Sequence, residues 1–332
     1  MIGKMIKNIG KFFKDTIIES CAALADPETS REDLDEAIEV ITSLSDEFDI
    51  YNDKEKLMVA TQAFTVLADV LSRDSEELVS TALQGIGEIG AVNRYEMNKG
   101  MISNFIEKRM HLITDSRIKV NVNAARCFSM YTDVIPGELN EKMAHEFLKN
   151  LNHESSEIRS TAAFWVGGLD KCEHITFNRL IPLLDDPAAE VRSHATSGLH
   201  MAHTGEEKIS DSLADKLIDL HKNDPDLEVK RTTADSLGKM CKHREDALDA
   251  LIESLNHQDS EVRHFSIFAL SDFGKKASKA VPFLIPFLDN KEHQEAAASA
   301  LNSIRTPEAV DALKKKKLYD EDAYYDDDDD ED

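Results

Sequence analysis

The sequence predicts an all-α protein, a right-handed α-solenoid built from about seven helical hairpins. One apolar pattern recurs along the chain, and the spacing between its copies is irregular. Hydrophobic residues make up 41% of the chain and aromatic residues only 6%, so the interior is expected to consist of aliphatic side chains in closely packed helices. A single globular core rarely grows to fill 332 residues, whereas stacked repeats escape that limit.

The recurring pattern is an apolar residue, a small or hydroxylated residue four positions later, and another apolar residue eight positions from the first. This spacing forms one stripe along a helix, and the small middle residue allows a neighbouring helix to approach closely. Four copies are clear and two are weaker: Ile158/Ala162/Val166, Val191/Ala195/Leu199, Val229/Thr233/Leu237, Val262/Ser266/Leu270, then Val120/Ala124/Phe128 and Leu78/Ala82/Ile86. A last copy keeps Ala297 and Leu301 but has His293 at its first position.

The predicted first helix of each hairpin precedes this pattern and ends in a turn that contains aspartate. The first-helix phrases are LIPLL from Leu180, LIDLH from Leu217, LIESL from Leu251 and FLIPFL from Phe283. Asp186, Asp224 and Asp259 lie in the turns that follow three of them. Aspartate at this position accepts hydrogen bonds from the free amides of the next helix and complements the helix dipole. The turns therefore mark where the second helices begin.

The phrase D-P-x-x-E-V-R with a following x-x-A-x-x-x-L resembles the HEAT-repeat superfamily, especially its bacterial lyase-like branch, over residues 27–306. The pattern anchors are 42, 38, 33, 38 and 33 residues apart, and such irregular spacing distinguishes HEAT units from tetratricopeptide and ankyrin arrays. The resemblance implies a ladder of aspartate and basic residues between neighbouring second helices. The basic positions of this ladder are Arg159, Arg192, Lys230 and Arg263. Asn121 and Val79 depart from it, so we expect the ladder to fail toward the N-terminus.

Two segments flank the predicted repeats. Residues 1–26 contain a basic amphipathic helix with lysines at positions 4, 7, 11 and 14 opposite an apolar stripe. Such a helix either caps the first repeat or, through residues 1–18, contacts a membrane surface or a partner groove. Residues 307–332 contain a lysine run and an acidic tail, whose composition predicts disorder.

Charge and cysteine usage limit the class of function. Residues 320–332 contain ten acidic side chains and no basic one, which leaves −15 of the formal net charge of −25 on the remainder. An acidic chain disfavours nucleic acid as a partner. The four cysteines, Cys21, Cys127, Cys172 and Cys241, form no C-x-x-C pair, so we expect reduced, mostly buried thiols. The sequence also lacks a predicted signal peptide or membrane span, and we expect a cytoplasmic protein.

Catalysis is not expected. Deoxyhypusine hydroxylase, a HEAT-like enzyme, binds two irons through His-Glu pairs, but here no Glu follows His194 or His264. The His-Glu dipeptides at 145–146 and 153–154 fall in a first helix and in a turn, so they should not converge on a metal. The sequence contains no recognisable motif of the phycobilin lyases and no Gly-rich phosphate loop. We therefore predict no cofactor, no metal and no enzymatic activity.

The predicted function is that of an interaction scaffold, which binds a segment of a partner protein on its concave surface. Trp165 occupies the repeat position held by Gly198, Ser236 and Ala269; it either fills a gap between repeats or anchors a partner. His194, His264 and Phe265 are near it in repeat register and are the other candidate contacts. The alternatives are a membrane-peripheral adaptor that uses the N-terminal helix and, with less support, a HEAT-like lyase-type enzyme.

Overall fold

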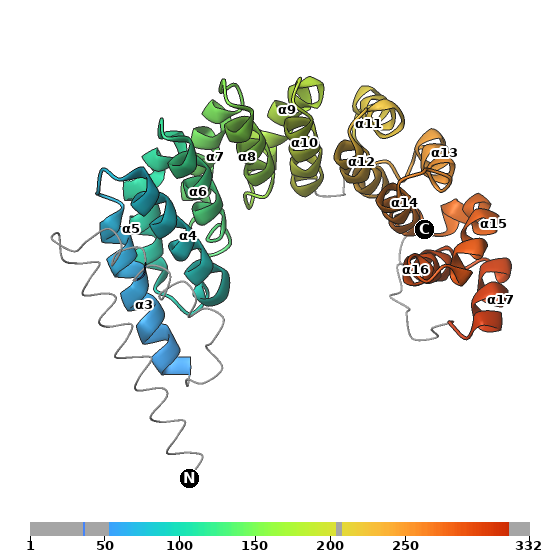
Figure 1. The fold of residues 1–332 in the computed structure, drawn as a ribbon, viewed down its shortest axis with the longest axis horizontal. Helices are drawn as coiled ribbons and strands as arrows, with labels where there is room; N and C mark the ends of the chain where they lie inside the picture. The colour runs from blue at the N-terminus through green and yellow to red at the C-terminus, as the bar shows by residue number, and fades with distance from the viewer. Residues whose placement is uncertain (1–35, 37–52, 204–207, 319–332) are drawn as a thin grey trace, which may run out of the picture. The chain divides into compact units, whose positions relative to one another are not determined.

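The structure, a computed structural model, describes residues 53–203 and 208–318 together with the single residue Glu36. All regular elements of this part of the chain are helical (Figure 1). The α-helices run as follows: α3 (Asp53–Val70), α4 (Glu76–Asn93), α5 (Lys99–Arg109), α6 (Ile118–Ser129), α7 (Gly137–Asn150), α8 (Ser156–Gly167), α9 (Glu173–Leu180), α10 (Ala189–Ala202), α11 (Asp211–Asn223), α12 (Leu227–Met240), α13 (Glu245–Ser254), α14 (Ser260–Asp272), α15 (Val281–Leu284), α16 (Gln294–Ile304) and α17 (Pro307–Lys316). Short 3-10 helices extend several of them: η2 (Met110–Thr114), η3 (Ile181–Asp185), η4 (Gly274–Ala280) and η5 (Ile285–Asp289).

The helices alternate between first and second helices of successive hairpins, which confirms the predicted α-solenoid class. Within the described residues, the second helices are α4, α6, α8, α10, α12, α14 and α16, and each of the six complete apolar patterns lies on one of the first six. Every residue of these patterns is buried. His293, which replaces the first apolar residue of the last pattern, is also buried and immediately precedes α16. Burial of this stripe against the first helix and against neighbouring second helices is the main source of stability in each hairpin.

The turns act as helix start signals, as the sequence indicates. Asp226 accepts hydrogen bonds from the amides of Glu228 and Val229, and Asp259 accepts one from the amide of Val262. Asp186 and Asp224, the other two aspartates that the sequence places in these turns, instead accept from the amides of Ala188 and Asp226, each one residue before its helix begins. In each case a carboxylate satisfies an amide that lies near the first turn of a helix.

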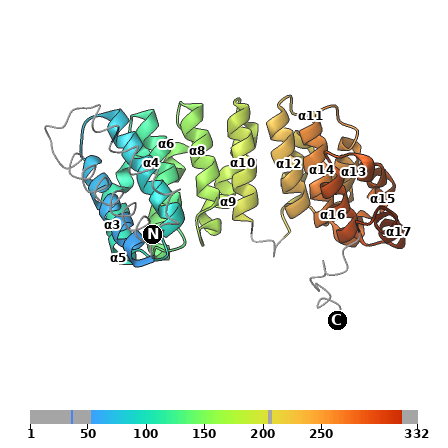
Figure 2. The same ribbon diagram turned by 60° about the horizontal axis from the view of Figure 1, so that its bottom comes forward.

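The chain forms two compact units, residues 1–179 and 180–332. In the first unit α4 packs between α3 and α6, and α6 packs on α8. In the second unit α12 packs between α10 and α14, and α14 packs on α16; Figure 2 shows α10, α12 and α14 side by side. Each unit therefore contains its own row of second helices covered by first helices.

Two glycines of α4 permit close packing in the first unit. The Cα of Cys127 lies 3.3 Å from where a Cβ on Gly87 would be, and a Cβ on Gly90 would overlap the ring of Tyr131. Tyr131 is fully buried and donates a hydrogen bond of 2.5 Å to the carbonyl of Ile86. Glycine at position 90 thus makes room for an aromatic ring from the adjacent hairpin.

The helical repeats continue beyond residue 306, where we expected the lysine run and tail to begin. Thr306 caps α17 by accepting a hydrogen bond from the amide of Ala309, and Pro307 occupies its first position. Ala309 and Leu313 of α17 are buried, and α17 packs on α16. The lysines at 314–316 form the last turn of this helix, where positive charge complements the dipole.

Candidate functional site

The predicted ladder residues share one contact: each donates to backbone carbonyls at or just beyond the end of the first helix that precedes its own helix. In the second unit, Arg192 Nη1 donates to the carbonyls of Asp186 and Pro187, at 2.9 and 3.2 Å. The other three make the equivalent contacts in their own hairpins: Arg159 with His153 and Glu154, Lys230 with His221 and Lys222, and Arg263 with His257 and Gln258. These carbonyls lie at the end of a first helix or just beyond it, where intrahelical partners are missing. The basic side chain therefore fixes the angle between the two helices of a hairpin.

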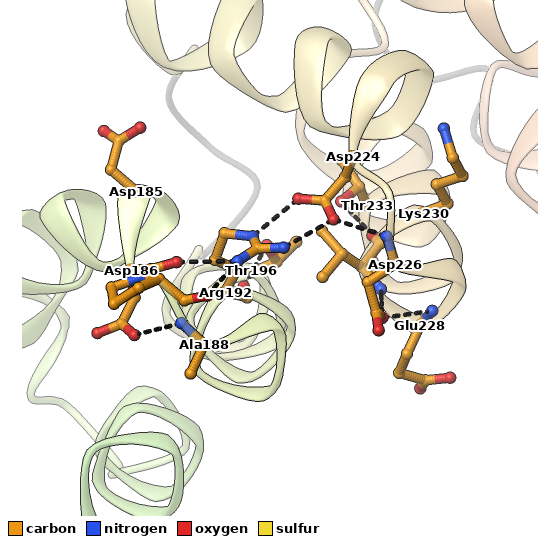
Figure 3. A network of polar contacts seen from close by, with 12 residues as sticks. Asp185, Asp186, Ala188, Arg192, Thr196, Asp224, Asp226, Glu228, Lys230 and Thr233 are labelled. Carbon is orange, nitrogen blue, oxygen red and sulfur yellow. Dashed lines mark hydrogen bonds and ion pairs between the residues drawn. The ribbon is translucent and has the colours of Figure 1, made fainter. Parts of the chain in front are cut away.

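Arg192 also joins two hairpins of the second unit (Figure 3). Its Nε and Nη2 atoms each donate to one carboxylate oxygen of Asp224, both at 2.8 Å. The two side chains are only 12% and 3% exposed. Burial opposes ionisation of Asp224, but hydrogen bonds from Arg192 and from the Asp226 amide outweigh it, so the pKa of Asp224 lies below its ordinary value. Planar, two-point pairing of this kind holds the α10 hairpin and the α11–α12 hairpin in one register.

The contact between the α11–α12 hairpin and the α13–α14 hairpin involves a residue that is not one of the predicted ladder positions. Arg231, one position after Lys230, places Nη2 3.3 and 3.4 Å from the carboxylate oxygens of Asp259. Beyond it, the hydroxyl of Ser260 bonds the carboxylate of Glu292. In the first unit, Asn150 donates to Asn121 at 3.0 Å, so the position that departs from the basic ladder carries a neutral amide contact instead.

A buried histidine joins three helices of the second unit. His221 of α11 lies 3.0 Å through Nδ1 from the carbonyl of Lys230, and 2.8 Å through Nε2 from the hydroxyl of Ser254. Because a carbonyl only accepts, Nδ1 carries the proton and Nε2 accepts from the serine. Burial lowers the pKa of His221 to about 4. The sequence gives no sign of this role, since His221 follows the apolar run LIDL as an ordinary polar residue would.

The first-helix side of the second unit carries a separate set of ion pairs between successive hairpins. Arg244 contacts Asp211 at 3.1 Å and Asp215 at 2.5 Å, and Lys279 contacts Glu245 at 3.1 Å and Asp249 at 2.6 Å. The carboxylates are largely exposed, so each pair stabilises the unit by no more than about 1 kcal/mol.

The four candidate partner contacts lie on three helices, one in the first unit and two in the second. Trp165 belongs to the first unit, where it is half-buried in the last turn of α8 and lies 4.9 Å from the ring of Phe164, edge to face. His194 is half-buried in α10 of the second unit. His264 and Phe265 adjoin each other in α14, with ring centroids 6.0 Å apart. A role of these four residues in binding stays a prediction.

His264 lies next to His293, which replaces the first apolar residue in the last copy of the repeat pattern. Its ring lies 5.8 Å from that of buried His293, which also contacts the ring of Phe287 at 5.6 Å. The Nε2 atom of His293 is 3.3 Å from the hydroxyl of Ser260. Burial lowers the pKa of His293, so a neutral imidazole replaces the aliphatic side chain of the other repeats.

Three features of the described residues bear on metal, small-ligand and membrane binding. Within residues 53–203 and 208–318, no group of three His, Cys, Asp or Glu side chains is placed to hold a metal ion. Two cavities of the first unit, of about 230 and 70 Å³, lie between α3 and α5 and between α4 and α6. Both are smaller than the roughly 300–1,000 Å³ of typical ligand pockets. No described helix is both long and apolar enough to cross a bilayer.

Three described cysteines are free and buried: Cys127, Cys172 and Cys241. Burial raises the pKa of Cys127, that of Cys172 to about 11 and that of Cys241 to about 12. Such thiols are poor nucleophiles at neutral pH. Cys21, the N-terminal basic helix and the acidic tail from residue 319 lie outside the described residues.

The architecture defines a helical-repeat solenoid protein, and comparison with known proteins identifies the repeat. The family model for HEAT repeats matches residues 177–271, 214–294 and 248–326. Residues 177–326 are therefore similar to HEAT repeats, in agreement with that part of the resemblance inferred from the sequence. No curated protein sequence matches the chain.

Comparison with solved structures supports the fold through one engineered protein. The crystal structure of an engineered protein has a TM-score of 0.52 and 20% identity, covering 91% of this chain and 82% of the engineered one. At this identity the likeness shows the fold alone. A designed armadillo repeat protein in complex with the peptide (KR)4 has a TM-score of 0.44 and 18% identity, covering 77% of this chain and 98% of the designed one. This likeness is too distant to say anything of binding by the present chain.

Proposed function

We propose that this protein is a non-catalytic scaffold that binds a segment of a partner protein on the exposed faces of its second helices. A HEAT-type array commonly serves protein interaction, because stacked helices present one continuous surface to a partner. The proposal includes a cytoplasmic location, supported by the free, buried thiols.

The observation that carries the proposal is the environment of Trp165. At the equivalent repeat positions, Gly198, Ser236 and Ala269 are buried, with Ser236 and Ala269 entirely inaccessible. Trp165 remains half-buried although it is much larger. A large aromatic ring that is partly open to solvent has apolar area left for a partner to cover.

Affinity purification from native cells, followed by quantitative mass spectrometry, tests this proposal. Trp165→Ser and His194→Glu should each reduce recovery of the partner at least about tenfold, as expected when an interface residue contributes more than about 1.4 kcal/mol. His174→Glu is the matched control, because His174 is an exposed residue of the first helix α9. Circular dichroism should be unchanged in all three variants. Equal recovery of the partner with all three variants would contradict binding at the second-helix faces.

A membrane-peripheral role would depend on residues 1–18, which lie outside the described residues, and a lyase-type activity has no described site to support it. Liposome co-sedimentation with and without residues 1–18 separates the first alternative from the scaffold. A chain that sediments only when these residues are present would favour the membrane role.

A further inference from the structure

The second-helix face of the second unit, formed by α10, α12, α14 and α16, exposes apolar side chains that the fold does not use. Phe268 in α14 is 44% exposed and Met201 at the end of α10 is 41% exposed. Lys239 of the neighbouring helix α12 lies 5.9 Å from the centre of the Phe268 ring. An exposed aromatic ring beside a cation is a suitable anchor for a partner, since covering it removes apolar area from water.

Carboxylates recur along this face with the period of the helices. Glu190, Glu228, Glu261 and Glu295 are each the second residue of their helix, and all four are exposed. Because successive second helices pack side by side, equivalent positions recur at the distance between helix axes, about 8–10 Å. In the first unit Lys119 occupies the equivalent position of α6, so the unbroken row belongs to the second unit.

The basic side chains of this face are already engaged within the protein. His200 contacts Asp235 at 2.9 Å, and Lys239 contacts Asp272 at 3.1 Å. Arg231 lies 3.1 Å from Glu228, one member of the row. The other three glutamates form no ion pair with any described residue. The face therefore presents uncompensated negative charge beside apolar area, which is complementary to a basic segment with an apolar side chain.

We propose that this face binds an extended segment of a partner protein with a basic side chain at about every third position and one apolar side chain packed on Phe268. This proposal rests on the scaffold function and specifies its partner. A polyproline II segment has three residues per turn and rises about 3.1 Å per residue, so side chains on one side recur every 9 Å or so. That repeat matches the helix spacing, whereas a β-strand repeats side chains on one side about every 6.6 Å.

The test is fluorescence anisotropy with the full chain and two labelled peptides of identical composition. The first peptide carries four lysines at every third position, with Pro and Ser between them and one Leu. The second has the same residues with the lysines contiguous and the Leu at the end. We expect the first peptide to bind at least about tenfold more tightly, and its affinity to fall with added salt because surface ion pairs are screened.

Variants locate the binding on the proposed face. Glu261→Lys and Phe268→Ser should each weaken binding of the first peptide about tenfold. Asp311→Lys makes a matched charge change on an exposed residue of α17 and should leave binding within about twofold. Circular dichroism must match the unmodified protein, and Glu295→Lys serves as a second charge variant if Glu261→Lys alters the fold.

The outcomes distinguish this inference from the scaffold function. Equal affinity for both peptides, or equal weakening by Asp311→Lys and Glu261→Lys, would show only diffuse attraction to an acidic chain and would overturn the inference. If neither peptide binds while a native partner is still lost on Trp165→Ser, the scaffold function stands and the basic segment is wrong.

Discussion

His221 should make the second unit sensitive to mild acid. In the folded protein its pKa is about 4, because burial disfavours the imidazolium and outweighs the hydrogen bond to the Lys230 carbonyl. An unfolded chain titrates this residue near its ordinary value of 6.5. Between these values the unfolded chain binds more protons, so the free energy of unfolding decreases as the pH falls from above 6.5 toward 4.

The expected magnitude follows from these two pKa values. Lowering the pH from 7.5 to 5.5 should reduce the free energy of unfolding by about 1 kcal/mol through His221 alone, and the full loss below pH 4 would be about 3 kcal/mol. A lower limit of 5.5 keeps the protein away from its isoelectric point near 4.8, where association interferes. A change of 1 kcal/mol corresponds to about a fivefold change in the local opening equilibrium.

The assay is hydrogen exchange of α11, α12 and α13 at the two pH values, corrected for the intrinsic rate, together with urea unfolding. His221→Asn keeps a donor near the position of Nδ1 but does not titrate, so it should lose the pH-dependent part of the opening equilibrium even if it is less stable overall. His145→Asn, a change at an exposed residue, is the control. An unchanged pH response in His221→Asn would show that another group titrates and would refute the reasoning.

Three further predictions concern packing, the ladder and the thiols. Gly90→Ala should destabilise the first unit by about 1–3 kcal/mol in urea unfolding, because the added methyl overlaps the Tyr131 ring and overpacking exceeds the gain in helix propensity. Gly137→Ala, where a Cβ meets nothing within 4 Å, should be neutral or stabilising by up to about 1 kcal/mol, and similar losses at both positions would contradict the packing argument. Arg192→Met should lower the free energy of unfolding by about 3 kcal/mol, because it leaves the buried carboxylate of Asp224 without its charged partner. A double-mutant cycle with Asp224→Asn measures the coupling energy between the two side chains. A coupling energy near zero would show that this pair does not stabilise the contact between hairpins. The three buried cysteines should react with a thiol reagent at pH 8 only as fast as the protein opens, so rapid modification of all of them, followed by peptide mapping, would contradict their burial.

The repeat pattern was sufficient to predict the fold because helical burial has a period that one sequence shows directly. Residues such as Val191, Ala195 and Leu199 lie on one side of a helix whatever surrounds it. The same local rule located Asp259, which acts on an amide three residues away, but for α12 it indicated Asp224, whereas the capping residue is Asp226. It missed α17, because four consecutive lysines and an acidic tail obscured the two apolar positions that this helix buries.

What the sequence determined by itself is therefore local: the α-solenoid class, the buried stripes and the turns between helices. The tertiary structure decided the contacts between hairpins. Lys230 and Arg231 are adjacent and chemically similar, so the sequence does not distinguish their roles. In the structure their side chains point in different directions, and Lys230 contacts its own hairpin whereas Arg231 contacts Asp259 of the next one. Burial of His221 and the space at Gly90 depend in the same way on residues 30 to 45 positions distant, and no periodicity within a single helix contains that information.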